Sequence, residues 1–473
     1  MEEHAVTFLV VGGGIAGVTC AETLAICCPE EKTLLLTESN VIKTVANLEP
    51  VARYLHKFDI LERQASENGE HILAPCVVTF VDQLQHIDSV TKRVLTRGNR
   101  SIKYKYLCLC TGGRPHLIMK DNPRVIGIRD TDSVLELQRQ LVDAKTIVIV
   151  GNGGIASELA SELDGVTVHW VIKDEHISST FVDPGAAHFF QQKGQDSATG
   201  DENKDKPTSV VKRLRYGEMQ PQKEITCKIG AALGPDWHRN FQLKGGLKTP
   251  ADSPIIHYKT QVKKISNEEE SLLVELSEGE SIHCDFVISA TGVDPRHDFT
   301  CDQQLTFAHD GGINVNAMME TNLPDIYAAG DACTAGWEIA AHWFQMRLWT
   351  QARQMGAMAG RSMAAAYQQE KIYQDFCFEL FGHVTQLFGY QVVLLGLYNG
   401  QGLNNDYEIL LRTTPGKEYI KFVLQNGKLR GAILIGNSEL AETCENLILN
   451  GIDLTPFGDD ILNPDIDIED YFD

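Results

Sequence analysis

Short apolar runs alternate with glycine-rich turns and helical stretches along most of the chain. In two regions an apolar run leads into a glycine turn, a helical stretch and a second apolar run. These segments fall at 6–11, 12–25 and 33–37 in the first region, and at 146–150, 153 onward and 166–172 in the second. Strand–helix–strand units of this kind build doubly wound parallel sheets. The pattern therefore predicts an α/β protein with two Rossmann-like dinucleotide-binding domains.

The remaining pattern predicts how the chain divides. A chain of 473 residues exceeds the size at which single cores stop growing, about 250–300 residues, so we expect about three domains. Further strand-like runs, a helical stretch at 341–366 and a mixed region after 375 complete the pattern. The predicted units are a discontinuous first dinucleotide domain (1–114 and 285–366), a second (115–284) with a polar, flexible insertion at about 191–253, a smaller C-terminal α+β domain (367–458) and an acidic tail (459–473).

The first glycine turn has the spacing Gly12-x-Gly14-x-x-Gly17. Gly12 permits a tight turn, Gly14 lets the backbone approach a pyrophosphate, and Gly17 lets helix and strand pack closely. The N–H groups at the helix start, around Ile15 and Ala16, are free to bind an anion. A glycine turn without a ligand is the alternative, and strand and helix in register argue against it.

Two carboxylates follow apolar strands. Glu38 comes 21 residues after Gly17, where an acid can accept hydrogen bonds from ribose hydroxyls. Asp331 closes the segment 321–331, beside Gly330, and could bind the ribityl hydroxyls of a flavin. A purely structural Asp331 is the alternative interpretation.

The second turn, Gly151-x-Gly153-x-x-Ala156, carries Ile155 at the helix start and alanine at the third position, as the fingerprint allows. The strand that follows ends in Lys173-Asp174. An acid there favours NAD and a basic residue tolerates the 2′-phosphate of NADP, so the choice between NADH and NADPH stays open.

These motifs together resemble the pyridine nucleotide-disulfide oxidoreductase family of two-domain flavoproteins. Thr111-Gly112-Gly113-Arg114-Pro115 and Ala290-Thr291-Gly292 are similar to its two connecting motifs. The resemblance implies FAD on the first domain and NAD(P)H on the second, with Thr111, Gly112 and Gly292 near the cofactors. It also implies that Glu158 pairs with a lysine near the flavin, for which Lys43 is our candidate. Two solvated side chains are the alternative.

The family's redox-active cysteine pair is missing from the corresponding stretch, 39–47. The carboxy-terminal His-Pro and Glu dyad is not visible either, and His383, the nearest histidine, is expected to be packed or on the surface. We therefore predict an enzyme that passes electrons from NAD(P)H through FAD to oxygen, a quinone-like acceptor or a protein, and that is not a disulfide reductase. A helix at Trp343–Trp349 is expected to aim its N-terminus at the flavin.

The charge and cysteines narrow the setting. The formal net charge is −22, which disfavours direct binding of nucleic acid or membrane. Twelve scattered cysteines without a CxxC pair fit a reducing compartment, and we predict no metal. The beginning of the chain shows neither a signal peptide nor a transit peptide, so a cytoplasmic or nuclear location is expected. The oligomeric state stays open.

A subgroup of the family that lacks the cysteine pair is similar in finer detail. The similar segments are 128–133, 233–238, 345–356 and 463–473. That subgroup is associated with keeping the tRNA-splicing ligase complex active under oxidising conditions, so the resemblance implies that complex as a partner. A rival hypothesis is a redox-gated binding module with slow catalytic turnover, in which the insertion and the acidic tail contact a partner. An inert, solvated tail is its alternative.

Overall fold

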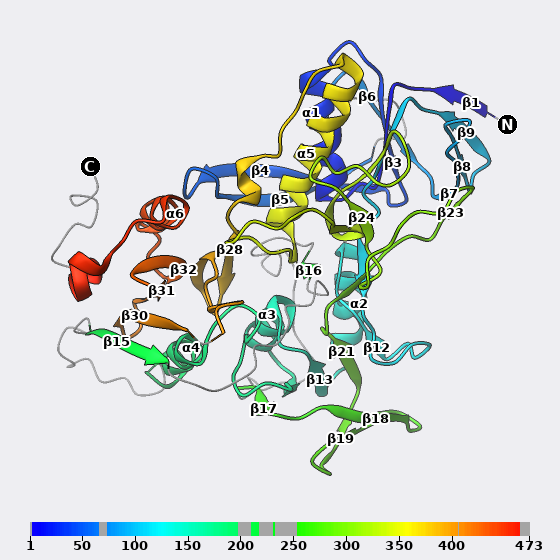
Figure 1. The fold of residues 1–473 in the computed structure, drawn as a ribbon. Coiled ribbons are helices and arrows are strands. Elements are labelled where there is room, and N and C mark those ends of the chain that lie inside the picture. Colours follow the sequence, from blue (N-terminus) through cyan, green and yellow to red (C-terminus); the bar gives the residue numbers. More distant parts are fainter. Residues whose placement is uncertain are drawn as a thin grey trace.

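The computed structural model describes residues 2–65, 73–196, 210–216, 230–231, 253–404 and 406–463. Two parallel sheets and one antiparallel sheet form the body of the molecule (Figure 1). Among the helices of these segments, none combines the length and the apolar character that a membrane crossing requires.

The first parallel sheet has the strand order β25-β10-β2-β3-β6. Its strands are β2 (Phe8–Val11), β3 (Thr33–Thr37), β6 (Val77–Val81), β10 (Tyr106–Leu109) and β25 (Ile326–Ala328). Helices α1 (Ile15–Cys27) and α5 (Trp349–Gln368) lie side by side next to it (Figure 1). They approach closely because α5 has glycine at the contact: a Cβ on Gly356 would lie 2.2 Å from the Ala16 carbonyl oxygen.

Two smaller sheets extend this domain. One has the order β1-β9-β8-β7-β23, and the other pairs β24 with β26. Their strands are β1 (Glu2–Ala5), β7 (Leu84–Asp88), β8 (Arg93–Thr96), β9 (Arg100–Lys103), β23 (Thr300–Cys301), β24 (Ile313–Val315) and β26 (Cys333–Ala335).

The second parallel sheet has the order β12-β21-β13-β14-β17. Its strands are β12 (Val125–Ile126), β13 (Thr146–Val150), β14 (Thr167–Val171), β17 (Ile255–His257) and β21 (Phe286–Ser289). The domain also has α2 (Thr131–Leu141), α3 (Gly154–Glu162), α4 (Pro184–Asp196), β18 (Val262–Asn267), β19 (Leu272–Leu276) and β20 (Ser281–Cys284). Two parallel sheets of this kind confirm the predicted fold class.

The two connecting motifs pair with each other. Strands β11 (Gly113–Pro115) and β22 (Val293–Pro295) are antiparallel. The chain thus leaves and re-enters the first domain through one two-stranded ribbon. Residues that flank β11 and β22 are therefore held next to that domain.

The third sheet is antiparallel, with the order β15-β30-β31-β32-β29-β28. Its strands are β15 (Val210–Tyr216), β28 (Gly382–Leu387), β29 (Tyr390–Gly396), β30 (Tyr407–Thr414), β31 (Glu418–Gln425) and β32 (Lys428–Ile435). Helix α6 (Ala441–Asn450) packs on this sheet, and the short 3₁₀ helices are η2 (Gly330–Ala332), η3 (Phe376–Phe378) and η4 (Thr455–Leu462).

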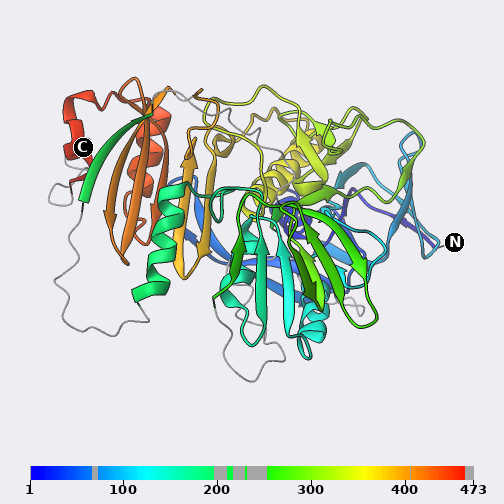
Figure 2. The ribbon, with the colours of Figure 1, turned by 90° about the horizontal axis from the view of Figure 1, so that it is seen from below.

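The predicted insertion at 191–253 contributes strands to other parts of the molecule. Figure 2 shows β15, in green, at the edge of the orange C-terminal sheet, where it pairs with β30. Strand β16 (Gly230–Ala231) pairs with β27 (Arg347–Leu348), just before α5. Residues 197–209, 217–229 and 232–252, where we predicted flexibility and a docked tryptophan, lie outside the described residues. The predicted domain boundaries and the acidic tail stay predictions.

A long hairpin occupies the stretch in which the family's cysteine pair was sought. Strands β4 (Val41–Pro50) and β5 (His56–Gln64) are antiparallel. The hairpin tip packs on the third domain, where Leu55 is buried and the Tyr54 N–H donates to the Glu445 carboxylate at 3.1 and 3.2 Å. Glu445 is itself buried, and burial raises the pKa of its carboxyl.

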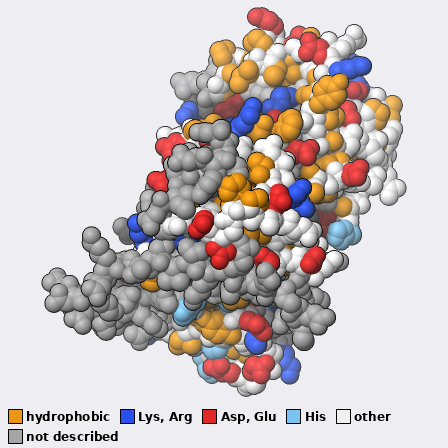
Figure 3. Space-filling model, turned by 60° about the vertical axis from the view of Figure 1, so that its left-hand side comes forward, with side chains coloured by type: hydrophobic (Ala, Val, Ile, Leu, Met, Phe, Trp, Pro, Cys, Tyr) orange, Lys and Arg blue, Asp and Glu red, His pale blue; other side chains and the backbone are white. Residues whose placement is uncertain are grey.

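The second and third domains share one hydrophobic core. Buried side chains of α3 and α4 contact those of β29 and β31, as in the cluster of Phe189, Tyr390 and Tyr419. The two domains therefore pack as one unit in this structure. On the described part of the face in Figure 3, acidic and basic side chains are interspersed with apolar ones.

Candidate functional site

A cavity opens at the carboxyl end of the first parallel sheet, over the first glycine turn. Its lining comes from the first turn, the end of β3, the β4–β5 hairpin, the segments that follow β6, β10 and β22, the start of α2, residues 329 and 331, and the start of α5. The predicted cofactor residues on its wall are Gly12, Gly14, Ile15, Ala16, Glu38, Lys43, Thr111, Gly112 and Asp331.

Three glycines of the first turn, at positions 12, 14 and 17, are each suited to their place for a different steric reason. Gly12 has φ +124°, and a Cβ there would lie 2.0 Å from the Cys110 carbonyl oxygen. Gly17 lies off the cavity, and a Cβ there would lie 1.9 Å from the Gly12 carbonyl oxygen. A Cβ on Gly14 would meet nothing within 4 Å, so its space faces the cavity. The turn therefore packs against the sheet on one side and is open to a ligand on the other.

The start of α1 faces the cavity without competition from a side chain. Gly14 is the N-cap and provides no side-chain hydrogen bond, and the first turn of α1 contains no acid. The first N–H groups of a helix have no partner within it, and they carry partial positive charge. Ile15 and Ala16 lie on the cavity wall, so this end of α1 is suited to a pyrophosphate.

Both predicted carboxylates lie in the cavity and are paired with arginines. The Glu38 Oε2 is 2.7 Å from Arg296 Nη2, and the Asp331 Oδ2 is 2.7 Å from Arg129 Nη2. Asp331 is buried, whereas the Glu38 side chain is about half exposed. Gly330 brings Asp331 close to α1, since it has φ +75° and a Cβ there would lie 2.7 Å from Ala16 Cβ.

Arg129 is a cavity residue that sequence reasoning did not identify. It immediately precedes α2, where Asp130 and Ser133 form a capping box and the Arg129 N–H donates to Ser133 Oγ at 2.9 Å. Its Nε donates to the Gly113 carbonyl at 3.0 Å. Its Nη1 is buried, with no hydrogen-bond partner among the described residues. This free donor on the cavity wall fits an anionic ligand.

Lys43 brings a buried cation to the cavity. Its backbone N–H donates to the Gly13 carbonyl at 2.9 Å, which ties the start of β4 to the first turn. Its Nζ lies 3.9 Å from Glu62 Oε1, and its side chain is 12% exposed. Burial, and next the charge of Arg129, lower the pKa of Lys43 to about 8, against the opposing effect of Glu62.

The predicted partner of Lys43, Glu158, is buried on α3 of the second domain and is not on the wall of this cavity. Lys43 and Glu158 each have polar or electrostatic interactions within the structure. Their pairing near a flavin stays a prediction.

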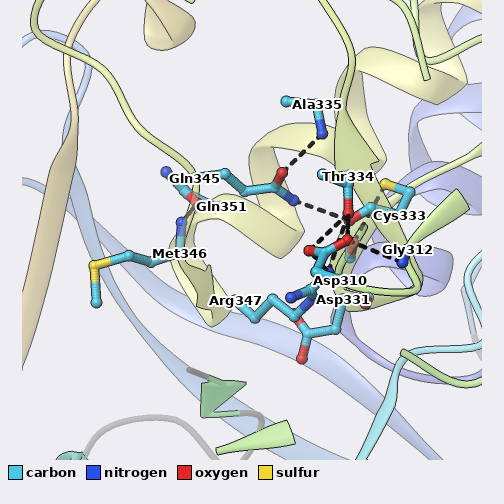
Figure 4. A network of polar contacts seen from close by, with 11 residues as sticks. Asp310, Gly312, Asp331, Cys333, Thr334, Ala335, Gln345, Met346, Arg347 and Gln351 are labelled. Atoms are coloured by element: carbon cyan, nitrogen blue, oxygen red, sulfur yellow. Dashed lines mark hydrogen bonds and ion pairs between the residues drawn. The ribbon is translucent and has the colours of Figure 1, made fainter. Parts of the chain in front are cut away.

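A buried polar network binds the backbone of Asp331 (Figure 4). Arg347 is fully buried, donates from Nε to the Asp331 carbonyl at 3.0 Å and pairs through Nη2 with Asp310 at 2.7 Å. Thr334 Oγ1 accepts from Arg347 Nη2 at 3.1 Å and also contacts Asp310. The Asp331 backbone is therefore fixed by a buried ion pair, and its carboxylate is left to face the cavity.

The same network overturns the predicted helix at Trp343–Trp349. That stretch is irregular up to β27, and α5 begins only at Trp349. Gln345 Oε1 accepts a hydrogen bond from the Ala335 N–H at 2.8 Å, and its Nε2 donates to the Cys333 carbonyl at 3.0 Å. Gln351 accepts from the Met346 N–H at 2.7 Å and donates to the Phe344 carbonyl at 2.8 Å. Gln351 thus satisfies backbone groups within the stretch, and Gln345 ties the stretch to β26.

The second turn has the same steric plan. Gly151 has φ +130°, and a Cβ there would lie 2.1 Å from the Ala290 carbonyl oxygen. A Cβ on Gly153 would meet nothing within 4 Å, and Ala156 is fully buried in the place of Gly17. Ile155 is half-buried beside it, and Gly292 of the connecting motif also has a positive φ, +105°.

The end of β14 separates the two candidate ribose readers. Lys173 is exposed, whereas Asp174 is buried and accepts from Asn152 Nδ2 at 3.0 Å. Asn152 Nδ2 also donates to the His176 carbonyl and to Ser179 Oγ, both at 2.9 Å, and its Oδ1 accepts from the Ser178 N–H at 2.6 Å. Asp174 is therefore engaged inside the domain, and Lys173 is the residue open to solvent.

Cys333 and His383 are both buried. Cys333 is fully buried, and burial raises the pKa of its thiol. His383 is packed, as expected, against Phe181 and Trp349, and its Nδ1 lies 3.0 Å from Thr350 Oγ1. Burial lowers the pKa of His383 to about 3, so its imidazole is neutral at physiological pH.

Sequence reasoning also missed Glu62 and Arg296 on the cavity wall. Trp349, which lies there too, belongs to the stretch 343–349 that was expected to face the flavin. Glu62 reaches the site through the pairing of β5 with β4, and Arg296 through the pairing of β11 with β22. No local motif reports such pairings. The one available signal was that Arg296 closely follows a connecting motif.

The fold and this site define a two-domain flavoprotein of the NAD(P)H oxidoreductase class. The chain belongs to the pyridine nucleotide-disulphide oxidoreductase family, whose model matches residues 6–197 and 255–356. It is 60% identical to pyridine nucleotide-disulfide oxidoreductase domain-containing protein 1 of Drosophila melanogaster, over 98% of this chain and 99% of that protein.

Solved structures show the same fold at low sequence identity. A ferredoxin reductase for the CYP199A2 system from Rhodopseudomonas palustris is 18% identical and has a TM-score of 0.67, over 98% of this chain and 99% of that one. An engineered water-forming NADPH oxidase bound to NADPH is 16% identical and has a TM-score of 0.63, over 94% and 91%.

The cofactors of the family, FAD and NAD(P)H, are those of this chain. The residues present fit FAD: the open side of Gly14, the free start of α1 and the unpartnered Arg129 Nη1 suit a pyrophosphate. Glu38 and Asp331, which also line the cavity, provide acceptors for hydroxyl groups.

Proposed function

We propose that this flavin-dependent NAD(P)H oxidoreductase delivers electrons to its acceptor without a dithiol relay, and that it is not a disulfide reductase. One observation carries the proposal: from the hairpin, where a relay cysteine was sought, the cavity wall receives the cation of Lys43. Among the described residues on that wall the one cysteine is Cys110, which lies behind Gly12 at the end of β10.

Bound FAD supplies the ability to take up a hydride from NAD(P)H and to release its electrons to a second substrate. The chain's own residues hold and tune it. The start of α1 and Arg129 neutralise the pyrophosphate, while Glu38 and Asp331 accept from hydroxyl groups. Lys43 places a positive charge, tied to the first turn, where negative charge builds on reduction. A pairing of Lys43 with Glu158 would orient that charge.

The acceptor that we propose is oxygen, a quinone-like molecule or a small redox protein. The structural neighbours named above include a ferredoxin reductase and a water-forming NADPH oxidase, which use acceptors of two of these classes. Exposed Lys173 beside engaged Asp174 supports acceptance of a 2′-phosphate, so we propose that NADPH is used at least as well as NADH.

The test is an anaerobic titration of the purified yellow protein with NADH and with NADPH, followed by flavin absorbance. We expect bleaching by both, then reoxidation by oxygen or a quinone but not by glutathione disulfide or another small disulfide. Lys43→Met should bleach more slowly at equal flavin content. A protein that contains flavin and reduces disulfides catalytically would contradict the missing relay, and a protein that binds no flavin would contradict the whole proposal.

We further propose that this activity protects a partner against oxidation in the cytoplasm or nucleus, and that the partner is the tRNA-splicing ligase complex. Only the resemblance to the subgroup supports the identity of that partner. The alternative is a redox-gated binding module with slow turnover. The pairing of β15 with β30 supports it, because residues 210–216 of the insertion form the edge strand of the third domain's sheet.

Co-purification with and without NAD(P)H tests the partner and distinguishes the alternatives. Capture of the ligase complex only with NAD(P)H, together with a long-lived reduced flavin, supports the module. Fast turnover with a simple acceptor and no capture supports an enzyme without that partner.

A further inference from the structure

The connecting ribbon of β11 and β22 carries an arginine onto the FAD cavity. Arg296 follows β22 directly, and its backbone N–H donates to the Gly112 carbonyl at 2.9 Å. The Thr111 hydroxyl donates to the Arg296 carbonyl. Both backbone groups of Arg296 are thus bound to the other connecting motif, which fixes the origin of its side chain at the cavity.

The guanidinium of Arg296 lies between two carboxylates from different segments. Its Nη2 is 2.7 Å from Glu38 Oε2, and its Nε is 2.7 Å from Asp298 Oδ2. Arg296, Glu38 and Asp298 all line the cavity. Arg114 pairs with the other oxygen of Asp298 at 3.0 Å but is not part of the cavity wall. Asp298 therefore holds the guanidinium in place, and Glu38 connects it to the end of β3.

We propose that Arg296 retains the bound cofactor: its ion pair with Glu38 spans the adenosine end of the cavity, and FAD leaves only when that pair opens. The proposal rests on the assignment of this cavity to FAD. One oxygen of Glu38 is held by Arg296, which leaves Oε1 to accept from a ribose hydroxyl.

The charges explain why the pair acts on release more than on folding. The Arg296 side chain is 33% exposed and that of Glu38 is 48% exposed, so the pair lies at the mouth of the cavity and not in the core. Exposed pairs contribute little to stability, because water and salt screen them. A pair that must open for a ligand to leave instead adds to the barrier for dissociation.

The experiment measures the rate of FAD release from the intact flavoprotein by the recovery of free-flavin fluorescence after dilution. Arg296→Met removes the cation and keeps the length of the side chain. Arg114→Met is the matched control, because it removes the other arginine on Asp298 and leaves Glu38 untouched. Arg296→Lys keeps the charge but cannot bind both carboxylates in the same planar geometry.

We expect release from Arg296→Met to be about 3–5-fold faster than from wild type, the range of a partly exposed ion pair, with Arg114→Met within about 2-fold of wild type and Arg296→Lys between wild type and Arg296→Met. Added salt should accelerate release more in wild type than in Arg296→Met, which a purely structural arginine would not cause. Equal thermal unfolding of the flavin-free forms shows that each variant folds.

Unchanged release in Arg296→Met, or equal acceleration in both methionine variants, would overturn the role of Arg296 while FAD binding itself stands. A wild-type protein that takes up no FAD would instead overturn the cavity assignment.

Discussion

The two glycine turns have the same backbone plan but differ at the residue that follows the first glycine. In the first turn the residue after Gly12 is Gly13, where a Cβ would lie 2.5 Å from Thr37 Oγ1. In the second turn the equivalent residue is Asn152, whose amide makes four hydrogen bonds within the domain. The first turn therefore requires a residue without a side chain at position 13. The second turn is instead held in its conformation by the side chain of Asn152.

The comparison teaches how one fold serves two kinds of ligand. The first turn lies in a cavity closed on several sides by the hairpin and the connecting ribbon, which suits a cofactor that stays bound. The second turn is held by its own loop at 174–179 and needs no ligand to keep its shape. A turn that is preformed without a ligand suits a substrate that binds and leaves in each cycle.

The largest effect is expected at the third position of the fingerprint. In Gly17→Ala the new Cβ would lie 1.9 Å from a backbone oxygen, which must move helix and strand apart. We expect a loss of at least about 1–3 kcal/mol and of most bound FAD. The matched change Ala156→Gly should cost only about 1 kcal/mol and leave the flavin content unchanged. Flavin-to-protein absorbance and thermal unfolding measure both. Equal flavin loss in the two variants would remove the distinction.

Asn152→Ala should affect only the second turn. It leaves the Ser178 N–H and the Asp174 carboxylate without this amide, at a cost of about 1–3 kcal/mol. We expect full flavin content but weaker NAD(P)H binding, measured by anaerobic flavin reduction at increasing NAD(P)H. Ser161→Ala, on the exposed side of α3, is the control. Normal NAD(P)H affinity in Asn152→Ala would show that the lock is not needed.

Lys43 gives the first turn a pH dependence. Folding lowers the pKa of Lys43 from 10.5 to about 8, so between these values the flavin-free native chain binds fewer protons than the unfolded chain. Its stability should therefore rise with pH in this window, relative to Lys43→Met, by at most about 1.4 kcal/mol per pH unit. Urea unfolding at pH 8 and pH 10 measures this. Exposed Lys264→Met is the control, and a flat difference would contradict the burial of the charge.

The smallest effect on stability is expected at the two open glycines. A Cβ on Gly14 or on Gly153 meets nothing within 4 Å, and both residues have negative φ. Gly14→Ala and Gly153→Ala should thus unfold within about 0.5 kcal/mol of wild type. We expect weaker FAD binding only in Gly14→Ala, and weaker NAD(P)H binding only in Gly153→Ala. Titration of flavin-free protein with FAD and of flavoprotein with NAD(P)H separates the two effects.

Local chemistry made most of the fold predictable. Apolar strands that lead into glycine turns report their own structure, because the backbone of Gly12 and Gly151 admits no other residue. The predicted start of α5 was wrong. Gln345 and Gln351 bind backbone N–H groups in the segments before this helix, and the hydrophobic pattern of the sequence does not report such contacts. Arg129 and Arg296 reach the cavity through a helix cap and a strand pairing. Cavity residues on one motif were therefore predictable, whereas those brought in by tertiary pairing were not.

The β4–β5 hairpin carries a last consequence. Its base is tied to Gly13 through the Lys43 N–H, and its tip is tied to Glu445 through the Tyr54 N–H. The hairpin therefore links the first glycine turn to the third domain. Inherited changes in α6 should accordingly be tolerated only when the hairpin tip changes with them, so these two distant segments are expected to have evolved as a pair.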